Sequence, residues 1–234
     1  MRVALLGLGK ITAAYQKGLD NSLLDLVAVI DHNPEALGRK IYNHLPFYLS
    51  LSDAIKEHQI DAVIIATPPH THDRLIEEAL LLGLDVIVEK IVSLNEESFK
   101  RLYMLAEQLH RKIHVMYHWQ YGQEMMHVKK LTKHLSIKTI DVTIHDSYCD
   151  EKGTILKDFL SLNGTIIDSL PNALSVIYWF VSLESFKMIE KNIIYDTLTN
   201  LPVEVKFSFL DSKNTNISIN LSWLNTDVKK ETII

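Results

Sequence analysis

The residues with the clearest chemical potential are two glycines close to the N-terminus. Gly7-Leu8-Gly9-Lys10-Ile11-Thr12 follows a short apolar run, Val3 to Leu6, and opens a helix expected to reach about Leu19. In such a strand–turn–helix unit the first glycine permits a tight turn, and the second lets the backbone approach a pyrophosphate at the helix N-terminus. Thr12 takes the third position of this fingerprint, where glycine or alanine is usual. The spacing predicts a phosphate-binding turn, with an ordinary tight turn as the alternative.

Asp31 lies 24 residues after Gly7, at the end of a second apolar strand, Leu26 to Ile30. A carboxylate there can accept hydrogen bonds from the hydroxyls of an adenosine ribose. It would repel a 2′-phosphate, so the sequence favours NAD over NADP. Arg39 and Lys40 lie close enough in sequence to keep NADP as an alternative. Asp31 could instead serve as a turn residue or helix cap ahead of Pro34.

The elements that position these residues alternate between strands and helices from Arg2 to Tyr117. Pro34 is expected to open a helix with Asn33 as its N-cap. Further strands are predicted at 62–66, 86–88 and 113–117, and helices at 73–82, ended by Gly83, and from Asn95 to 109. Apolar strands separated by helices are typical of a doubly wound parallel sheet. The sequence therefore predicts an α/β fold with a Rossmann domain over residues 1–120.

The pattern changes in residues 121–234. A helix over about 123–135 precedes a β-branched strand at 137–144, and an apolar helix is expected over 169–180. Alternating apolar residues at 203–209 and 217–223 are typical of antiparallel strands. We expect an α+β domain with an open, mostly antiparallel sheet.

Composition excludes several functional classes. The net charge of −5 argues against a nucleic-acid-binding protein, which would normally show a basic face. Cys149 is the only cysteine, so neither an intrachain disulfide nor a thiolate metal site is expected. His70 and His72 lack a third ligand at a recognisable spacing, so no metal is expected either. Without a signal peptide or a long apolar run, the chain is expected to be cytoplasmic and not in a membrane.

Together these motifs resemble the glucose–fructose oxidoreductase / inositol dehydrogenase (Gfo/Idh/MocA) family. The resemblance covers residues 1 to about 225. Within the family, Asp168 to Ser175 is most similar to the aldose 1-dehydrogenases that act on galactose or arabinose, and many other members carry histidine where Asn172 stands. The matching segments are Gly7 to Ile11, Asp31, Ala66 to His72, Gly83 to Lys90, Tyr117-His118, and Asp168 with Asn172.

The resemblance implies a role for each matching residue. Lys90 would lie beside the nicotinamide and the reacting hydroxyl, and Asp168 and Asn172 would flank the same hydroxyl from the second domain. Either Lys90 or Asp168 would take the proton, whereas Asn172 cannot titrate and would only hydrogen-bond. The cofactor contacts it implies are Gly7, Gly9, Lys10, Ile11, Asp31, Thr67, Pro68, His72, Glu89 and Lys90. The substrate contacts expected are His118, Tyr121 and Asp146.

Each of these roles has a plainer alternative. Glu89 and Lys90 could form a surface ion pair at the end of a strand. Asp168 could cap the following helix, whose first turn Pro171 suits. Asn172 could be an ordinary helix residue, and His118 and Tyr121 could be exposed surface residues.

The chain also departs from the family. Ile91 stands where most members have a proline after the Glu-Lys pair, and the second domain is expected to be truncated. The function this implies is NAD(P)-dependent hydride transfer to or from a sugar or polyol hydroxyl, with aldose C1 as one option. The alternatives are a catalytically weak dinucleotide-binding sensor or scaffold, and a reductase of an imine or tetrapyrrole. A homo-oligomer, dimer or tetramer, is expected through the C-terminal sheet.

Overall fold

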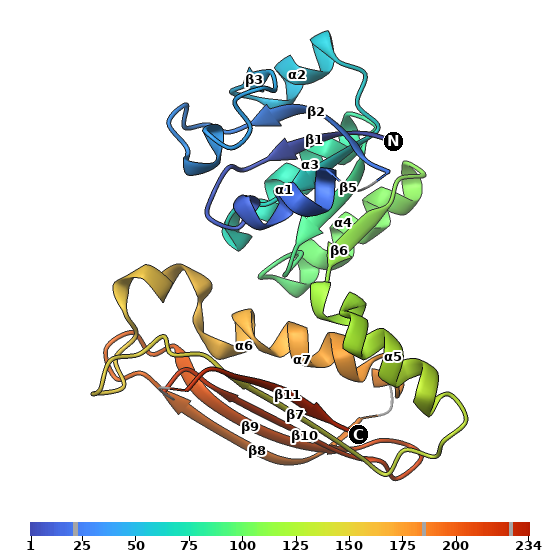
Figure 1. Cartoon of the computed structure of the whole chain (residues 1–234), viewed down its shortest axis with the longest axis vertical. Helices are drawn as coiled ribbons and strands as arrows, with labels where there is room; N and C mark the ends of the chain where they lie inside the picture. Colours follow the sequence, from blue (N-terminus) through green and yellow to red (C-terminus); the bar gives the residue numbers. More distant parts are fainter. Residues whose placement is uncertain (21–22, 184–185, 225–226) are drawn as a thin grey trace. The chain divides into compact units, whose positions relative to one another are not determined.

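The computed structural model describes residues 1–20, 23–183, 186–224 and 227–234, and the chain divides into two compact units (Figure 1). The first unit spans Met1–Met116 and the second Tyr117–Ile234. Within the described residues, no helix is both long and apolar enough to cross a membrane.

The first unit contains a six-stranded sheet in the order β3-β2-β1-β4-β5-β6, and every neighbouring pair is parallel. This confirms the predicted doubly wound sheet. Its strands are β1 (Arg2–Leu6), β2 (Asp25–Ile30), β3 (Phe47–Tyr48), β4 (Ala62–Ile65), β5 (Asp85–Glu89) and β6 (Ile113–Met116). Its helices are α1 (Thr12–Asp20), α2 (Leu51–Glu57), α3 (His72–Leu81) and α4 (Glu96–Gln108).

Both faces of this sheet are buried, because successive side chains along a strand point to opposite faces. In β1, Ala4 and Leu6 join the core cluster that includes residues of α3 and α4. Val3 and Leu5 join a second cluster, against which residues of α1 pack. The continuous apolar runs of the sequence are thus explained by helices on each side of the sheet.

Two predicted helix ends are confirmed by their local geometry. The Asn95 side chain accepts a hydrogen bond of 2.9 Å from the backbone N–H of Ser98 and caps α4. Gly83 follows α3 with a φ of +77°, a left-handed conformation that glycine adopts without steric cost.

The helix predicted from Pro34 is wrong. Asn33 does not cap a helix, because its Oδ1 accepts from the N–H of Glu35 at 3.0 Å in a local turn, and only a 3-10 helix, Leu37–Arg39, follows. Gly38 then packs so closely that an added Cβ would lie 2.7 Å from Thr12 Oγ1. Tertiary packing against the glycine turn therefore replaces a regular helix. Strand β3 and helix α2 were not predicted.

The second unit contains a five-stranded sheet in the order β11-β7-β10-β9-β8, in which only β7 and β10 are parallel. The predicted mostly antiparallel sheet is confirmed. Its strands are β7 (Thr139–His145), β8 (Lys187–Tyr195), β9 (Pro202–Leu210), β10 (Asn216–Ser222) and β11 (Lys229–Ile233). The outermost strands, β8 and β11, were not predicted, since both are largely exposed and lack a clean apolar alternation.

Helices α6 (Gly164–Asp168) and α7 (Leu170–Ile177) lie along one face of this sheet (Figure 1). Ala173 and Ile177 of α7 pack with Ile140, Val142 and Phe207 of the sheet in one apolar core. The predicted helix over 169–180 corresponds to α7, and the predicted helix over 123–135 corresponds to α5 (Gln123–Thr132).

Candidate functional site: a dinucleotide cavity and a separate polar cluster

The turn between β1 and α1 needs glycine at its first position. Gly7 has a φ of +96°, and a Cβ added there would lie 2.8 Å from the carbonyl oxygen of Ala66. A Cβ added at Gly9 would meet nothing within 4 Å, so space is open beside this part of the turn. The two glycines therefore have different roles. Gly7 allows β1 and β4 to approach each other closely, and Gly9 leaves room for a ligand.

Thr12 fixes the same turn from inside. It is fully buried, and its hydroxyl donates to the carbonyl of Gly9 at 2.7 Å. Tyr42 donates in turn to the Thr12 carbonyl at 2.8 Å. Threonine at the third fingerprint position thus closes the turn that leads into α1, in which Lys10 and Ile11 are exposed.

Asp31 holds the glycine turn and keeps capacity for a ligand. Its Oδ2 accepts from the N–H of Leu8 at 2.7 Å, and its Oδ1 accepts from the N–H of Asn33 at 2.8 Å. His32 also lies close, with Nδ1 3.3 Å from Oδ1. A carboxylate offers about four lone-pair sites. The two backbone contacts therefore leave it able to accept further hydrogen bonds, as a ribose diol would require.

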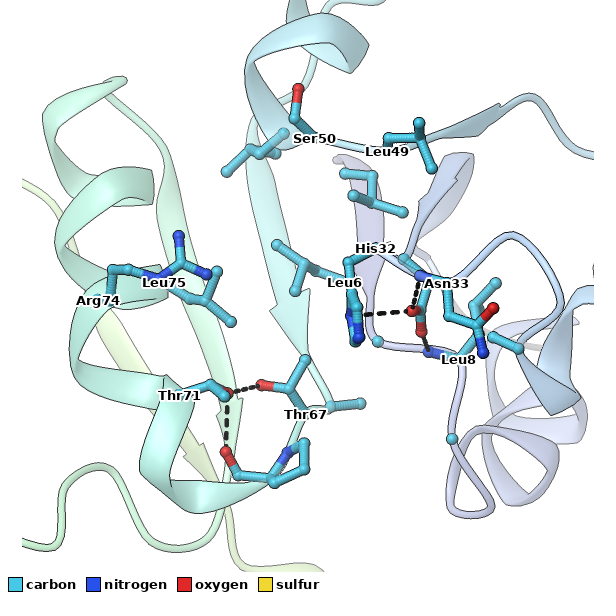
Figure 2. A pocket seen from close by; sticks show the side chains of 18 of the residues that line it. Leu6, Leu8, His32, Asn33, Leu49, Ser50, Thr67, Thr71, Arg74 and Leu75 are labelled. Carbon is cyan, nitrogen blue, oxygen red and sulfur yellow. Dashed lines mark hydrogen bonds and ion pairs between the residues drawn. The ribbon is translucent and has the colours of Figure 1, made fainter.

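These residues open onto one cavity of about 430 Å³, within the size range of ligand pockets. Figure 2 shows His32, Asn33 and Leu8 on one side of it, and Thr67, Thr71 and Arg74 on the other. Of the predicted cofactor contacts, Gly7, Gly9, Asp31, Thr67 and Pro68 line this cavity.

Sequence reasoning missed much of the cavity wall. Leu49 and Ser50 line it from the segment between β3 and α2, and Arg74 and Glu78 line it from α3. The position of Arg74, near the start of the helix that follows the Thr-Pro-Pro turn, was a signal from which this part of the wall could have been predicted. Arg74 pairs with Glu78 at 3.3 Å, whereas Arg39, which kept NADP as an alternative, places its guanidinium 4.8 Å from the centre of the Phe47 ring.

Glu89 and Lys90 come at the carboxyl end of β5. The Tyr15 hydroxyl of α1 donates to the Glu89 carboxylate, and burial, together with this carboxylate, raises the pKa of Tyr15. Glu89 therefore accepts a hydrogen bond inside the first unit. Lys90 is half-buried, and the peptide bond from Lys90 to Ile91 is cis.

His72, expected to contact the cofactor, is fully buried at the start of α3. Its Nδ1 lies 2.6 Å from the carbonyl oxygen of Ile91, and its Nε2 lies 2.9 Å from that of Thr67. Both ring nitrogens are thus engaged by the protein. The imidazole is placed to hold two loops rather than to reach a ligand.

In the second unit, Asp168 and Asn172 lie one helical turn apart. Asp168 ends α6, and Asn172 of α7 points its Nδ2 to the Asp168 carbonyl at 3.4 Å. The side chain of Asn172 is buried, and its Oδ1 has no partner among the described residues. The same holds for the hydroxyl of Ser169, the N-cap residue of α7.

Asp146 follows β7 and is ion-paired. Its Oδ1 lies 3.0 Å from Lys230 Nζ of β11, and its side chain is 8% exposed against 46% for Lys230. Burial raises the pKa of the neighbouring Tyr148 to about 12, and the negative charges of Asp146 and Asp168 add to this effect. Two carboxylates therefore act on one tyrosine. Lys230 and Tyr148 were not predicted, since no sequence spacing links them to Asp146 and Asp168.

His118 and Tyr121 lie in a 3-10 helix, His118–Tyr121, and both are exposed. The ring of Tyr121 meets that of Trp179 edge-on, with centroids 6.3 Å apart. No group of three metal-ligating side chains occurs among the described residues.

The parallel sheet and the glycine turn of the first unit agree with a match between this chain and a known protein family. Residues 1–117 match the model of the oxidoreductase family with an NAD-binding Rossmann fold, GFO_IDH_MocA, which covers half of the chain. The chain belongs to the Gfo/Idh/MocA family. The cofactor of this family, NAD, is the one that Asp31 and the glycine turn predicted.

Relatives of known name match about half of this Gfo/Idh/MocA chain. The inositol 2-dehydrogenase of Rhizobium meliloti is 31% identical over 132 residues, which are 56% of this chain and 40% of that protein. The rhizopine catabolism protein MocA of Rhizobium meliloti is 26% identical over 115 residues, 49% of this chain and 36% of that protein. The matched part thus spans about two fifths or less of these relatives.

Solved structures extend the likeness in fold to both units. An NAD-binding protein from Listeria innocua superposes with a TM-score of 0.83 at 17% identity, covering 99% of this chain and 69% of its own. The WlbA dehydrogenase from Bordetella pertussis, in complex with NADH and UDP-GlcNAcA, gives a TM-score of 0.83 at 18% identity, covering 99% and 70%. The likeness in fold to these solved structures therefore includes the second unit.

Proposed function

We propose that this chain is an NAD-dependent dehydrogenase that acts on a hydroxyl group of a sugar or polyol, with the C1 hydroxyl of an aldose as one target. The observation that carries the proposal is the cavity bounded by Gly7, Gly9 and Asp31, in a chain of this family. A pyrophosphate fits the open space beside Gly9, and the remaining lone pairs of Asp31 suit an adenosine ribose. The inositol 2-dehydrogenase named among the relatives supports a polyol substrate.

NAD supplies the acceptor for the hydrogen that leaves the alcohol carbon. The chain must then take the hydroxyl proton, a step to which a positioned acid–base group contributes about 10²–10⁴-fold. Lys90 and Asp168 are the two proposed groups. Asn172 holds a hydroxyl by hydrogen bonds only, and its unpartnered Oδ1 is an acceptor suited to that role.

A turnover screen tests the proposal. The full chain is assayed with NAD and NADP against aldoses and polyols, including galactose, arabinose and myo-inositol, following reduced cofactor by absorbance. Lys90→Ala and Asp168→Ala should each lower kcat by about 10²–10⁴-fold, with NAD affinity nearly unchanged. Lys100→Ala and Asp158→Ala, at exposed positions, are the matched controls and should behave as wild type.

Two results would count against the proposal in different ways. Full activity in either Lys90→Ala or Asp168→Ala would remove that residue from the acid–base step. A wild-type chain that binds NAD but turns over no sugar or polyol would contradict the enzyme itself. Asn172, which stands where many members carry a titratable histidine, favours NAD sensing without turnover as the second candidate.

A further inference from the structure

The imidazole of His72 connects two loops of the first unit that come from different strands. The loop after β4 contains Thr67 and lines the cavity, and the loop after β5 carries Lys90 and Ile91. The ring lies between the carbonyl oxygens of Thr67 and Ile91, at 2.9 and 2.6 Å, and has no exposed surface. No other side chain is described as bonding to both loops.

Each of the two contacts needs a proton on the ring. A carbonyl oxygen only accepts hydrogen bonds, so an imidazole nitrogen facing one must donate its N–H. A neutral ring can satisfy one of these carbonyls, and a cationic ring can satisfy both. Because the ring is fully buried, losing either contact would leave a carbonyl oxygen without this partner, which would destabilise the folded chain.

The loop at Thr67 is itself fixed against the cavity. Its hydroxyl lies 2.6 Å from that of Thr71, which donates to the Pro68 carbonyl at 2.8 Å (Figure 2). A Cβ at Gly7 would meet the Thr67 methyl at 2.7 Å, so the same loop touches the glycine turn. His72 therefore contacts both the cavity wall at Thr67 and Ile91, the residue that follows Lys90.

We propose that His72, held in α3, is a positioning residue with two separate arms. In the Ile91 arm, Nδ1 holds the Ile91 carbonyl and so sets the neighbouring Lys90, and in the Thr67 arm, Nε2 holds the Thr67 carbonyl at the wall of the NAD cavity. The role of Lys90 in this proposal rests on the proposed function, whereas the tie to the cavity wall does not. His72 touches neither NAD nor substrate and acts only through the two loops.

Substituting His72 by asparagine or glutamine tests the two arms separately. The asparagine amide nitrogen takes the place of imidazole Nδ1, and the glutamine amide nitrogen takes the place of Nε2, each as a donor. His72→Asn thus retains the bond to Ile91 and loses that to Thr67, and His72→Gln does the reverse. His72→Ala loses both, and His70→Ala, at an exposed position in the same turn, is the control.

The experiment measures NAD affinity by calorimetry, and kcat with NAD and either galactose or myo-inositol, on the full chain. His72→Gln should bind NAD as wild type but lose about 10²-fold in kcat, the scale of a misplaced catalytic group. His72→Asn should retain a kcat close to wild type and lose about tenfold in NAD affinity, the scale of one lost hydrogen bond. His72→Ala should show both losses and His70→Ala neither.

Identical profiles for His72→Asn and His72→Gln, or wild-type values in both, would overturn the positioning role. If the wild-type chain turns over neither galactose nor myo-inositol, the proposed function fails. The NAD affinities of the His72 variants still test the Thr67 arm. That arm is supported if His72→Gln binds NAD more tightly than His72→Asn and His72→Ala. It is overturned if the three variants bind NAD equally.

Discussion

The two units build their polar sites from different parts of the chain. In the first unit the site is mostly backbone: the amides and open space of the Gly7–Gly9 turn, held by Asp31 and Thr12. In the second unit it is mostly side chains: Asp146 paired with Lys230, and Tyr148 near Asp146 and Asp168. A backbone site tolerates few residue types at its closest contacts, whereas a site of paired side chains depends on which partners meet. This difference predicts how each unit responds to substitution.

The largest effects are expected at the glycine turn. Gly7→Ala should lower the free energy of unfolding by about 1–3 kcal/mol, because alanine is strained at positive φ and its Cβ would crowd the Ala66 carbonyl. Gly9→Ala should leave stability near wild type but weaken NAD binding by about 5–150-fold, since its methyl fills the space left for a pyrophosphate. Chemical denaturation and calorimetry measure the two effects.

Gly18→Ala is the matched control for both glycine variants. Gly18 lies in α1 with nothing within 4 Å of an added Cβ, so alanine should stabilise the helix by about 0.5–1 kcal/mol and leave NAD affinity unchanged. If Gly7→Ala proved as stable as Gly18→Ala, the close approach of β1 and β4 would not be what requires glycine.

In the Asp146–Lys230 pair, removing one partner should destabilise the protein more than removing the other, a difference that a turn built from backbone cannot show. Lys230→Met leaves a nearly buried carboxylate without its cation and should cost about 1–3 kcal/mol of unfolding free energy. Asp146→Asn leaves a half-exposed ammonium that water can solvate, and should cost under about 1 kcal/mol. Thermal unfolding measures which variant is less stable. A larger loss of stability in Asp146→Asn than in Lys230→Met would show that the ion pair does not shield the carboxylate.

A smaller effect is expected from Tyr148 at alkaline pH. Tyrosines of the unfolded chain titrate near about pH 10, whereas folded Tyr148 has a pKa of about 12. Between these values the folded state holds the extra proton, so the free energy of unfolding falls as pH rises. Tyr148→Phe should therefore lose less stability across this range than wild type, as measured by urea unfolding.

Tyr178→Phe serves as the control for the alkaline measurement, because Tyr178 is 64% exposed. It should follow the wild-type pH dependence. An equal pH dependence in Tyr148→Phe and wild type would contradict the burial of the Tyr148 hydroxyl beside two carboxylates.

The same difference explains what the sequence could predict. The parallel strands, the glycine turn and Asp31 follow from apolar runs and local spacing. The helix expected at Pro34 failed because Gly38 packs against Thr12 and the N–H of Gly38 donates to the Leu8 carbonyl, tertiary contacts that no local pattern encodes.

Residues brought together by strand order were beyond prediction. Leu49 and Ser50 reach the cavity because β3 lies beside β2, and Lys230 meets Asp146 because β11 pairs with β7. Strand β11 has mostly exposed residues, so its sequence gave no sign of a partner. The motif predicted His72 as a cofactor contact, whereas its ring nitrogens lie at two carbonyl oxygens of the protein.

Calorimetric titration of the full chain with NAD and NADP tests the central claim, that the dinucleotide lies over the Gly7–Gly9 turn with Asp31 at its ribose. NAD should bind with one site per chain, and NADP should bind at least about tenfold more weakly, because the Asp31 carboxylate repels a 2′-phosphate. Binding of neither dinucleotide, or equal affinity for both, would contradict the account.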